Sequence, residues 1–489
     1  MKQLLLVSCL AFILHISDLT AQMTNDFYQV ETIQTPEGIA SEVSAITFTR
    51  DGRLAACFRR GTIALMDPES RQWKIFASGL DTPLGIVEGK GPSEFYVVQR
   101  PELTRVADLD GDGVADLYQT VCDDWGVSGN YHEFAFGLVQ DQDENFYVTL
   151  SLASQLQGVR QPVRGELSDS MKKIGQFSAV KYRGWVLKIS PDGVATPIAC
   201  GLRQPNGLGR NLEGDIFITD NQGDFVAASP LYHVTPGAFF GQPASLVWEP
   251  GFQGDPMKIP SEKLKRRRKR PAIEMPYGDL SSSAAEPLCD RTKGKFGPYA
   301  GQFMIAEFTH PRIVRAALEI VDGEYQGACF PFLDQNGLRK GNVRLAFAPD
   351  GNLYVAQTAR GWVGAEGLQR VTWTGKVPMD VLKMSLKQDG FELTFTHPLD
   401  SATASDPAAY AVQHYYYHYH PTYGSPKVDA TPVTISGVSV SEDKKRVHLI
   451  LPDLKTERNY QVTFHGLQSE TKEPLIIPFA VYTLNRLRA

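Results

Sequence analysis

Ser78-Gly79-Leu80-Asp81-Thr82-Pro83-Leu84-Gly85-Ile86 returns further along the chain as Cys200-Gly201-Leu202-Arg203-Gln204-Pro205-Asn206-Gly207-Leu208. A second unit, an apolar strand followed by a turn and another apolar strand, recurs as well. Its copies span 45–54 and 345–355, with degenerate copies over 136–148 and 207–219. Hairpins that repeat in this way, each unable to bury its faces alone, are typical of propeller blades. At roughly 40–50 residues a blade, residues 27–375 hold enough chain for a six-bladed β-propeller.

The rest of the chain predicts a second domain of the same fold class. With 489 residues the chain is too long for one ordinary core. Its 43 glycines and 31 prolines, together with few long helical periodicities, favour an all-β protein. After Gly375, apolar and polar residues alternate over 384–386, 391–395, 447–451 and 460–464. This alternation predicts a small immunoglobulin-like β-sandwich over 379–489.

The N-terminus has the pattern of an export signal. Lys2 precedes the apolar run 4–16, and Leu19-Thr20-Ala21 offers small residues for cleavage. The run is too short to cross a bilayer, so residues 1–21 are interpreted as a signal peptide, with no transmembrane segment elsewhere. The mature protein is expected to be secreted or periplasmic. A net charge of -6 gives no indication of a nucleic-acid partner. The sequence contains no Cys-x-x-Cys-His motif for covalent haem.

An acidic loop is a candidate metal site. Asp108, Asp110, Asp112 and Asp116 stand at relative positions 1, 3, 5 and 9, with a glycine at position 6. Alternating carboxylates around a glycine turn are the ligands of a calcium loop. Position 12 is Gln119, so the bidentate glutamate of an EF-hand is missing. We expect calcium to stiffen this loop without taking part in chemistry; a solvated acidic turn is the alternative.

His132 is the candidate catalytic base. It stands just before an apolar hairpin formed by 134–139 and 146–150. A histidine at the entry of such a hairpin can project from the mouth of a β-structure, and its ordinary pKa lies close to neutral pH. The alternative is a hydrogen-bonded histidine that only orients its loop, and the sequence leaves both interpretations open.

Two further segments have unusual composition. The basic run Lys263–Arg270 could bind an anionic polysaccharide or an acidic partner, or could be a solvated loop. In the run His414–His420, alternate histidines and tyrosines would share one face of a strand. That face could bind a metal or stack on sugar, or could be aromatic packing on an edge strand.

The stretches Leu202–Leu208 and Gly214–Asp224 resemble the soluble glucose/sorbosone dehydrogenase superfamily, and the chain is most similar to exported "membrane-bound dehydrogenase" type proteins. The resemblance covers roughly residues 27–375 and leaves the C-terminal domain outside. It implies a six-bladed propeller that holds pyrroloquinoline quinone (PQQ) at one mouth.

The resemblance also implies roles for single residues. His132 would take the hydroxyl proton of the substrate, and Arg203 would face the carboxylates of PQQ. Gln204 replaces the asparagine of the family motif, although Asn206 is close by. Two further cofactor-facing groups are implied, namely Lys295 and Arg344, the latter one place out of register. Arg360 has no clear counterpart in the family, but it is expected to project from the equivalent loop and is a further candidate. PQQ is a planar tricarboxylate, so guanidinium and ammonium groups suit its pocket. Ordinary ion pairs between blades are the alternative for each.

These observations predict a secreted, calcium-containing quinoprotein dehydrogenase that oxidises a sugar or polyol hydroxyl and passes electrons to a separate acceptor such as a cytochrome. A non-catalytic glycan-binding protein of a polysaccharide-degradation system is the alternative. A metal-dependent lactonase is less favoured, because few carboxylates converge near His132.

Overall fold

The computed structural model describes residues 26–156, 158–168, 175–359 and 364–488. The fold is all-β, as predicted, and its helices are short: α2 (Ser261–Arg267), α3 (Ser401–Ala404) and the 3-10 turns η1 (Pro243–Trp248), η2 (Pro256–Lys258) and η3 (Pro407–Ala409). Within these residues, none of the helices has the length and apolar character needed to cross a membrane. The predicted signal peptide 1–21 and the candidate site residue Arg360 lie outside the described residues.

The part before residue 376 is built from antiparallel four-stranded units that follow one another along the chain. The first three are β2 (Val43–Phe48), β3 (Leu54–Phe58), β4 (Thr62–Met66) and β5 (Trp73–Ala77); β6 (Gly85–Glu88), β7 (Glu94–Val98), β8 (Leu103–Ala107) and β9 (Leu117–Cys122); and β10 (Ala135–Gln140), β11 (Phe146–Leu150), β14 (Trp185–Ile189) and β15 (Ala195–Cys200). The short strands β12 (Ala153–Ser154) and β13 (Gln176–Phe177) pair beside the third unit.

Three more units follow. They are β16 (Gly207–Arg210), β17 (Ile216–Thr219), β18 (Ser229–His233) and β19 (Ile273–Met275); β20 (Ala284–Cys289), β21 (Phe303–Glu307), β22 (Ile313–Val321) and β23 (Glu324–Phe332); and β24 (Asn342–Phe347), β25 (Leu353–Gln357) and β26 (Gly367–Trp373). The last unit is completed by β1 (Tyr28–Ile33), which pairs with β26 so that Tyr28 lies opposite Trp373. The beginning and the end of this part are therefore joined in one sheet.

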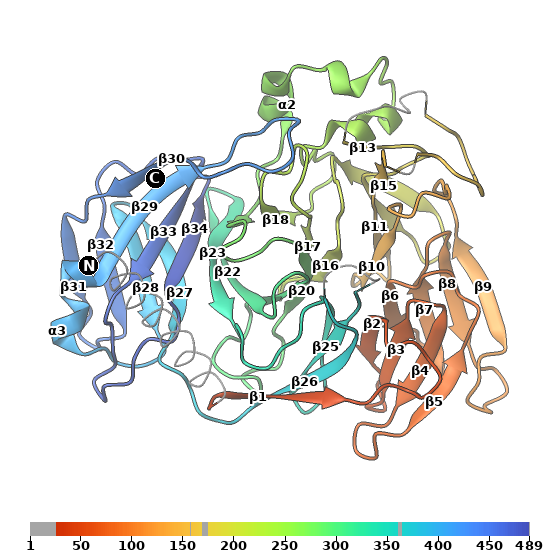
Figure 1. The fold of residues 1–489 in the computed structure, drawn as a ribbon, viewed down its shortest axis with the longest axis horizontal. Helices are drawn as coiled ribbons and strands as arrows, with labels where there is room; N and C mark the ends of the chain where they lie inside the picture. The colour runs from red at the N-terminus through yellow and green to blue at the C-terminus, as the bar shows by residue number, and fades with distance from the viewer. Residues whose placement is uncertain (1–25, 157, 169–174, 360–363, 489) are drawn as a thin grey trace, which may run out of the picture.

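The first strands of the units form a closed circle. Each contacts the next, in the order β2, β6, β10, β16, β20, β24 and back to β2. Apolar side chains fill the space between neighbouring units; all five residues of β3, for example, are buried. Figure 1 shows the units arranged around a common centre. This arrangement is propeller-like, and the repeated hairpins of the sequence predicted it.

The antiparallel pairing divides the connecting loops between the two ends of this circle. A segment that enters a first strand lies at the same end as the segment that leaves the second strand. We call this the entry end. Turns between first and second strands, and between third and fourth strands, lie at the opposite end, which we call the turn end. The assignment of loops to the two ends decides which predicted residues meet.

The C-terminal part consists of two packed sheets. One contains β27 (Val381–Lys387), β28 (Gly390–Phe395), β32 (Arg446–Ile450) and β31 (Gly437–Val440). The other contains β34 (Phe479–Leu484), β33 (Arg458–Phe464), β29 (Tyr410–Tyr416) and β30 (Val428–Val433). Phe391, Val447, Tyr460 and Tyr482 are among the buried residues between them. The structure thus contains a sandwich here; that its topology is immunoglobulin-like stays a prediction.

The sandwich is joined to the propeller-like part through a continuous sheet. β34 pairs with β23, so the fifth unit and one sandwich sheet form eight strands in a row. Beside this seam, Arg315 and Asp380 form an ion pair at 3.1 Å, and neither side chain is exposed. Tyr299 donates to the same carboxylate at 2.5 Å. Because a buried guanidinium needs such partners, this contact makes the two parts depend on each other.

The basic run Lys263–Arg270 is largely engaged in ion pairs. Arg267 pairs with Glu249, Arg268 lies 3.3 Å from Glu274, and Arg270 lies 3.0 Å from Glu457 of the sandwich. Three of its arginines are therefore neutralised by neighbouring carboxylates, and the run is not an uninterrupted free patch.

Candidate functional site

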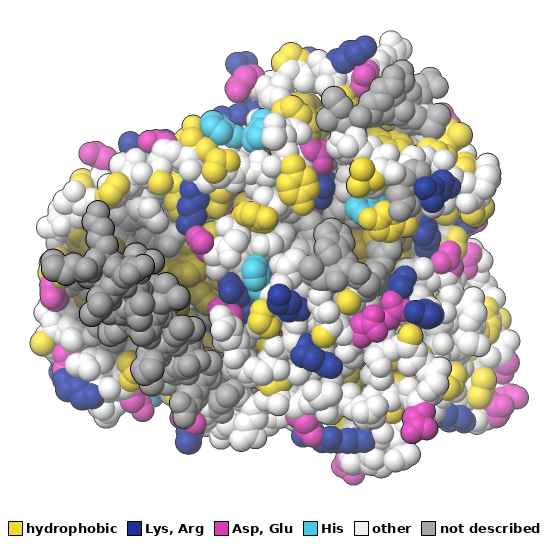
Figure 2. All heavy atoms as spheres, viewed as in Figure 1, with side chains coloured by type: hydrophobic (Ala, Val, Ile, Leu, Met, Phe, Trp, Pro, Cys, Tyr) yellow, Lys and Arg dark blue, Asp and Glu magenta, His cyan; other side chains and the backbone are white. Residues whose placement is uncertain are grey.

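A large cavity lies at the entry end of the circle. Its volume is about 2090 Å³, and it is lined by residues that precede first strands and by residues that follow second strands. Four of the predicted site residues line it: His132, Arg203, Asn206 and Arg344. The face drawn in Figure 2 carries hydrophobic and basic side chains close together around the centre of the circle. The fold therefore brings together residues that are far apart in the sequence.

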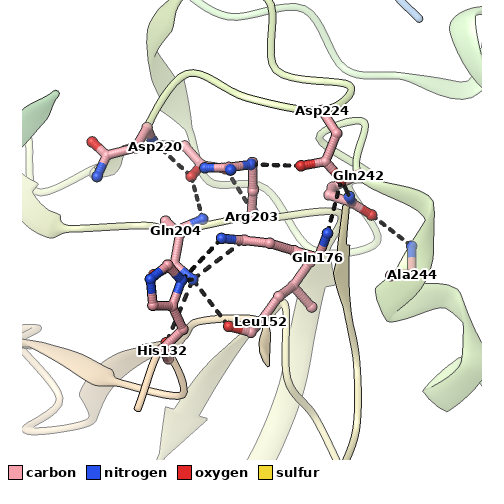
Figure 3. A network of polar contacts seen from close by, with 10 residues as sticks. His132, Leu152, Gln176, Arg203, Gln204, Asp220, Asp224, Gln242 and Ala244 are labelled. Carbon is pink, nitrogen blue, oxygen red and sulfur yellow. Dashed lines mark hydrogen bonds and ion pairs between the residues drawn. The ribbon is translucent and has the colours of Figure 1, made fainter. Parts of the chain in front are cut away.

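A hydrogen-bonded chain of amides holds His132 (Figure 3). Nε2 of Gln204 donates to the carbonyl oxygen of Leu152 at 2.9 Å and to Oε1 of Gln176 at 3.2 Å. Nε2 of Gln176 then lies 3.2 Å from Nδ1 of His132. The other ring nitrogen, Nε2, lies 2.7 Å from the hydroxyl of Tyr131.

These hydrogen bonds determine which ring nitrogen of His132 carries the hydrogen. A carbonyl oxygen only accepts, so the amide of Gln204 must point its nitrogen at Leu152 and at Gln176. Gln176 then presents its own nitrogen to Nδ1 of His132, which must be the acceptor. A neutral imidazole accepting at Nδ1 carries its hydrogen on Nε2, directed at Tyr131. Any other group that hydrogen-bonds to Nδ1 of His132 therefore has to compete with the Gln176 amide.

Arg203 is fixed by buried carboxylates. Its Nε donates to Asp224 at 2.8 Å, and both side chains are nearly buried. The other oxygen of Asp224 accepts from Gln242 at 2.6 Å. The carboxylate of Asp220 accepts backbone N–H bonds from Arg203 and Gln204. Burial raises the pKa of Asp220 to about 6, although those bonds and the Arg203 charge act against the rise.

Arg344 lies at the floor of the cavity and bridges several units. Its guanidinium donates to the carbonyl oxygens of Leu84, Asn206 and Val343 at 2.7–2.8 Å. The ring centroid of Phe136 lies 5.4 Å away. Within the described part of the chain its guanidinium has no ion-pair partner, and only 2% of Arg344 is exposed. Burial lowers its pKa, and the charge of Glu286 opposes this. The hydrogen-bond acceptors of this cation are neutral carbonyls, and the nearby carboxyl of Glu286 partly offsets its charge.

Glu286 on β20 is a second ionisable group near this floor. Its Oε2 accepts the backbone N–H of Leu345 at 2.6 Å. Burial raises the pKa of Glu286 to about 7, while Arg344 and this bond lower it. Glu286 could not be singled out from the sequence, because an isolated glutamate in an apolar strand has no motif around it.

The structure places Lys295 away from the cavity. It lies in the β20–β21 turn, at the turn end, and its Nζ donates to the carbonyl oxygen of Pro349 at 2.8 Å. Of the four predicted residues that line the cavity, His132, Arg203 and Asn206 lie in loops at the entry end, and Arg344 lies near the beginning of β24 at the same end. Lys295 is therefore not brought together with them, and Arg360 lies outside the described residues.

The acidic loop also lies at the turn end, between β8 and β9. Ligand oxygens of Asp108, Asp110 and Asp116 lie within 4.8 Å of one another, and Asp112 is not part of this group. Asp108 accepts from the backbone N–H groups of Gly111 and Gly113. Those bonds contribute to lowering its pKa. Three carboxylates thus converge in this loop, which lies at the end of the circle opposite the cavity.

The cavity has a wall that was not predicted from the sequence. The β29–β30 connection of the sandwich reaches the entry end, and Pro421, Thr422 and Tyr423 line the cavity. The predicted face of alternating histidines and tyrosines is interrupted, because β29 ends at Tyr416 and its pairing shifts after His414. The tyrosine-rich composition of this segment was the only signal of its role.

Comparisons with known proteins agree with the fold. A family profile described as "Domain of unknown function (DUF7133)" matches residues 66–366. No curated protein sequence matches the chain. The PQQ domain of a pyranose dehydrogenase from Coprinopsis cinerea has 12% identity and a TM-score of 0.50, covering 71% of this chain and 95% of its own.

Two bacterial enzymes are similar at lower TM-scores. A PQQ-bound aldose sugar dehydrogenase from Streptomyces coelicolor has 15% identity and a TM-score of 0.45, covering 71% of this chain and 98% of its own. The soluble aldose sugar dehydrogenase of Escherichia coli has 13% identity and a TM-score of 0.48, covering 71% and 99%. At these identities the likeness concerns the fold alone.

Proposed function

This chain belongs to the family of DUF7133, a domain of unknown function, and we propose that it is a quinoprotein-like dehydrogenase that oxidises a sugar or polyol hydroxyl in the entry-end cavity. The observation that carries the proposal is that one cavity collects His132, Arg203, Asn206 and Arg344. These are the base and three of the cofactor-binding residues that the sequence resemblance implied.

The cavity suits a planar polyanion such as PQQ. Among the described residues, neither terminal nitrogen of Arg203 makes a hydrogen bond, so both are available to a carboxylate. The charge of Arg344 adds to them, and Phe134 and Phe136 supply apolar walls. Guanidinium groups beside aromatic surface fit a flat tricarboxylate. We therefore propose Arg203, Asn206 and Arg344 as cofactor-binding residues and leave out Lys295, which lies at the turn end.

When bound, PQQ supplies the acceptor for hydride. The residues of the chain orient the substrate and handle its proton. A substrate hydroxyl that replaces the Gln176 amide would donate to Nδ1 of His132, and that nitrogen would take the proton as the hydroxyl is oxidised. The Nε2 hydrogen bond to Tyr131 would then hold the imidazolium in place.

The remaining parts of the proposal concern the whole protein. We propose a six-bladed β-propeller followed by an immunoglobulin-like sandwich, exported by the signal peptide 1–21. A separate carrier such as a cytochrome would receive the electrons. Calcium would bind Asp108, Asp110 and Asp116, with Asp112 less directly involved, and would stabilise the turn end.

The test uses the full mature chain reconstituted with PQQ and calcium. We expect PQQ binding at micromolar concentration, followed by reduction of an artificial dye in the presence of aldoses. His132→Ala should abolish dye reduction while keeping PQQ bound, and Arg203→Met should weaken PQQ binding. Arg53→Met is the control, because Arg53 pairs with Asp51 in a β2–β3 turn at the turn end. Absence of PQQ binding would reject the proposal; glycan binding without dye reduction would favour the non-catalytic alternative.

A further inference from the structure

Large apolar side chains are exposed around the mouth of the cavity. Among the residues lining it, Leu156, Tyr277 and Tyr423 are 84%, 47% and 64% exposed. They come from three different parts of the chain: the segment after β12, the segment after β19 and the sandwich. Exposed apolar groups that gather around one opening mark a binding surface more often than scattered ones do.

The position of Tyr423 is fixed by the propeller-like part. Its backbone bridges to that of Asp224, and the N–H of Gly424 donates to the carbonyl of Gly223 at 3.0 Å. The Arg203 guanidinium lies 5.2 Å from the centroid of the Tyr423 ring. This cation occupies one side of the ring, so the exposed remainder of the ring faces the open cavity.

A second set of contacts anchors the same sandwich loop. The hydroxyl of Tyr419 donates to the carbonyl of Gly241, and the N–H of Phe225 donates to the carbonyl of His420 at 3.0 Å. Arg268 lies 5.2 Å from the centroid of the Tyr419 ring. The loop is therefore held through Tyr419, His420 and Gly424 against the segments that carry Gly241 and Asp224, and these contacts support the position of Tyr423.

The polar lining around these rings is mostly uncharged. Hydroxyl and amide side chains predominate, among them Ser154, Asn221, Gln222, Ser282, Ser283 and Thr422. Most of the charged lining residues are paired: Arg203 with Asp224, Arg59 with Glu42, and Lys258 with Asp255. Arg344, which has no such partner among the described residues, is almost fully buried. Uncharged donors and acceptors beside exposed aromatic rings suit a neutral polyhydroxylated ligand, whose C–H faces pack on the rings while its hydroxyls bond to the polar groups.

The size of the cavity indicates more than one sugar unit. Pockets for a drug-sized ligand measure about 300–1,000 Å³, whereas this cavity measures about 2090 Å³. A cofactor and a monosaccharide together would leave part of that volume unfilled. Tyr277 and Tyr423 belong to the exposed part of the lining, where further sugar units could rest.

We propose that Tyr423 and Tyr277 form a stacking subsite for a neutral oligosaccharide, so that the sandwich contributes directly to substrate binding. The inference deepens the proposed function: the hydroxyl that is oxidised would belong to the end of a sugar chain whose following units rest on these tyrosines. The family profile ends at residue 366, so it does not include Tyr423.

The test measures binding to the full chain without cofactor, independently of activity. Calorimetric titrations would use glucose, cellobiose and cellotriose, with maltose and maltotriose as a second series. In at least one series we expect the affinity for the sugar to rise by about tenfold from one to three sugar units, because each stacked aromatic ring adds binding free energy of this size. Tyr423→Ala and Tyr277→Ala should each remove most of that gain, and Tyr423→Phe should keep it.

The matched control is Tyr118→Ala, because Tyr118 is 45% exposed but lies on β9, outside the cavity lining. It should leave the chain-length dependence unchanged, and thermal unfolding should confirm that all variants fold.

Affinity that does not depend on chain length, or that Tyr423→Ala does not affect, would overturn the proposal. Loss of PQQ binding alone in Tyr423→Ala would assign the ring to the cofactor and also overturn it. Oligosaccharide binding that depends on Tyr423 but comes without dye reduction would uphold the subsite and reject the dehydrogenase.

Discussion

Gln176 donates to Nδ1 of His132 at 3.2 Å, and this contact places the imidazole hydrogen on Nε2, toward Tyr131. The orientation of Gln176 is set in turn by Gln204, which must donate to a carbonyl oxygen. The candidate base is thus presented as a neutral acceptor whose lone pair is covered by an amide. A ligand hydroxyl has to compete with that amide.

Gln176→Glu should reverse the tautomer of His132. A carboxylate accepts where the amide donates, so the hydrogen should move to Nδ1. Nitrogen-15 chemical shifts of the imidazole would show the hydrogen on Nε2 in the natural protein and on Nδ1 in the variant. Gln155→Glu is the control, since it adds the same charge at another position of the cavity lining. A hydrogen on Nδ1 in the natural protein would contradict the assignment.

Glu286 should make the protein less stable as pH rises. Its pKa is about 7 in the folded state and near 4.5 when unfolded. The folded state therefore binds the proton more tightly, and its stabilising effect is complete below about pH 4.5 and lost as pH rises through about 7. Glu286→Gln does not titrate, so its stability relative to the natural protein should increase over this range, by at most about 3 kcal/mol. Chemical denaturation at pH 4.5, 6 and 8 checks this; a constant difference would show that Glu286 titrates normally.

Arg315→Met should destabilise both parts of the molecule together. It leaves Asp380 buried without its cation, which costs about 3–5 kcal/mol. Because β23 and β34 share one sheet, we expect one cooperative urea transition that moves as a whole. Lys444→Ala breaks an exposed pair with Glu470 and should change stability by less than about 1 kcal/mol. Two separate transitions, with only one displaced, would show that the sandwich folds independently.

Calcium should raise the melting temperature through the acidic loop. Binding to the folded state alone stabilises it in proportion to the logarithm of the free calcium concentration. Asp108→Asn removes one of the three converging carboxylates and should abolish the effect, as should chelation. Asp192→Asn, in an exposed turn between β14 and β15, is the control. If calcium shifted the melting temperature of both variants equally, the acidic loop would not be its binding site.

The local pattern was sufficient to predict the strands and their repetition. Hairpins such as 45–54 and 345–355 bury apolar residues on both faces, so their composition alone requires neighbouring sheets on either side. The resemblance to a known family also pointed to Arg203 and Asn206, which directly precede β16, and to Arg344 near the beginning of β24. Their meeting in one cavity follows from closing the repeats into a circle.

Other features depend on which loop lies at which end. Lys295 and Arg344 are both cationic and both close to a strand, yet antiparallel pairing sends one to the turn end and the other to the entry end. Likewise, nothing in the sequence around Gln176, Gln204 and His132 indicates that their side chains are linked by hydrogen bonds.

By itself, then, the sequence determined an all-β chain of repeated hairpins with a histidine and several arginines at the loops, because strand periodicity and turn residues act over short distances. Only the tertiary structure decided that Tyr423 of the sandwich stands over Arg203, and that an amide covers Nδ1 of His132. Such contacts join residues that are distant along the chain, and their geometry depends on how the sheets close and on where each backbone carbonyl points.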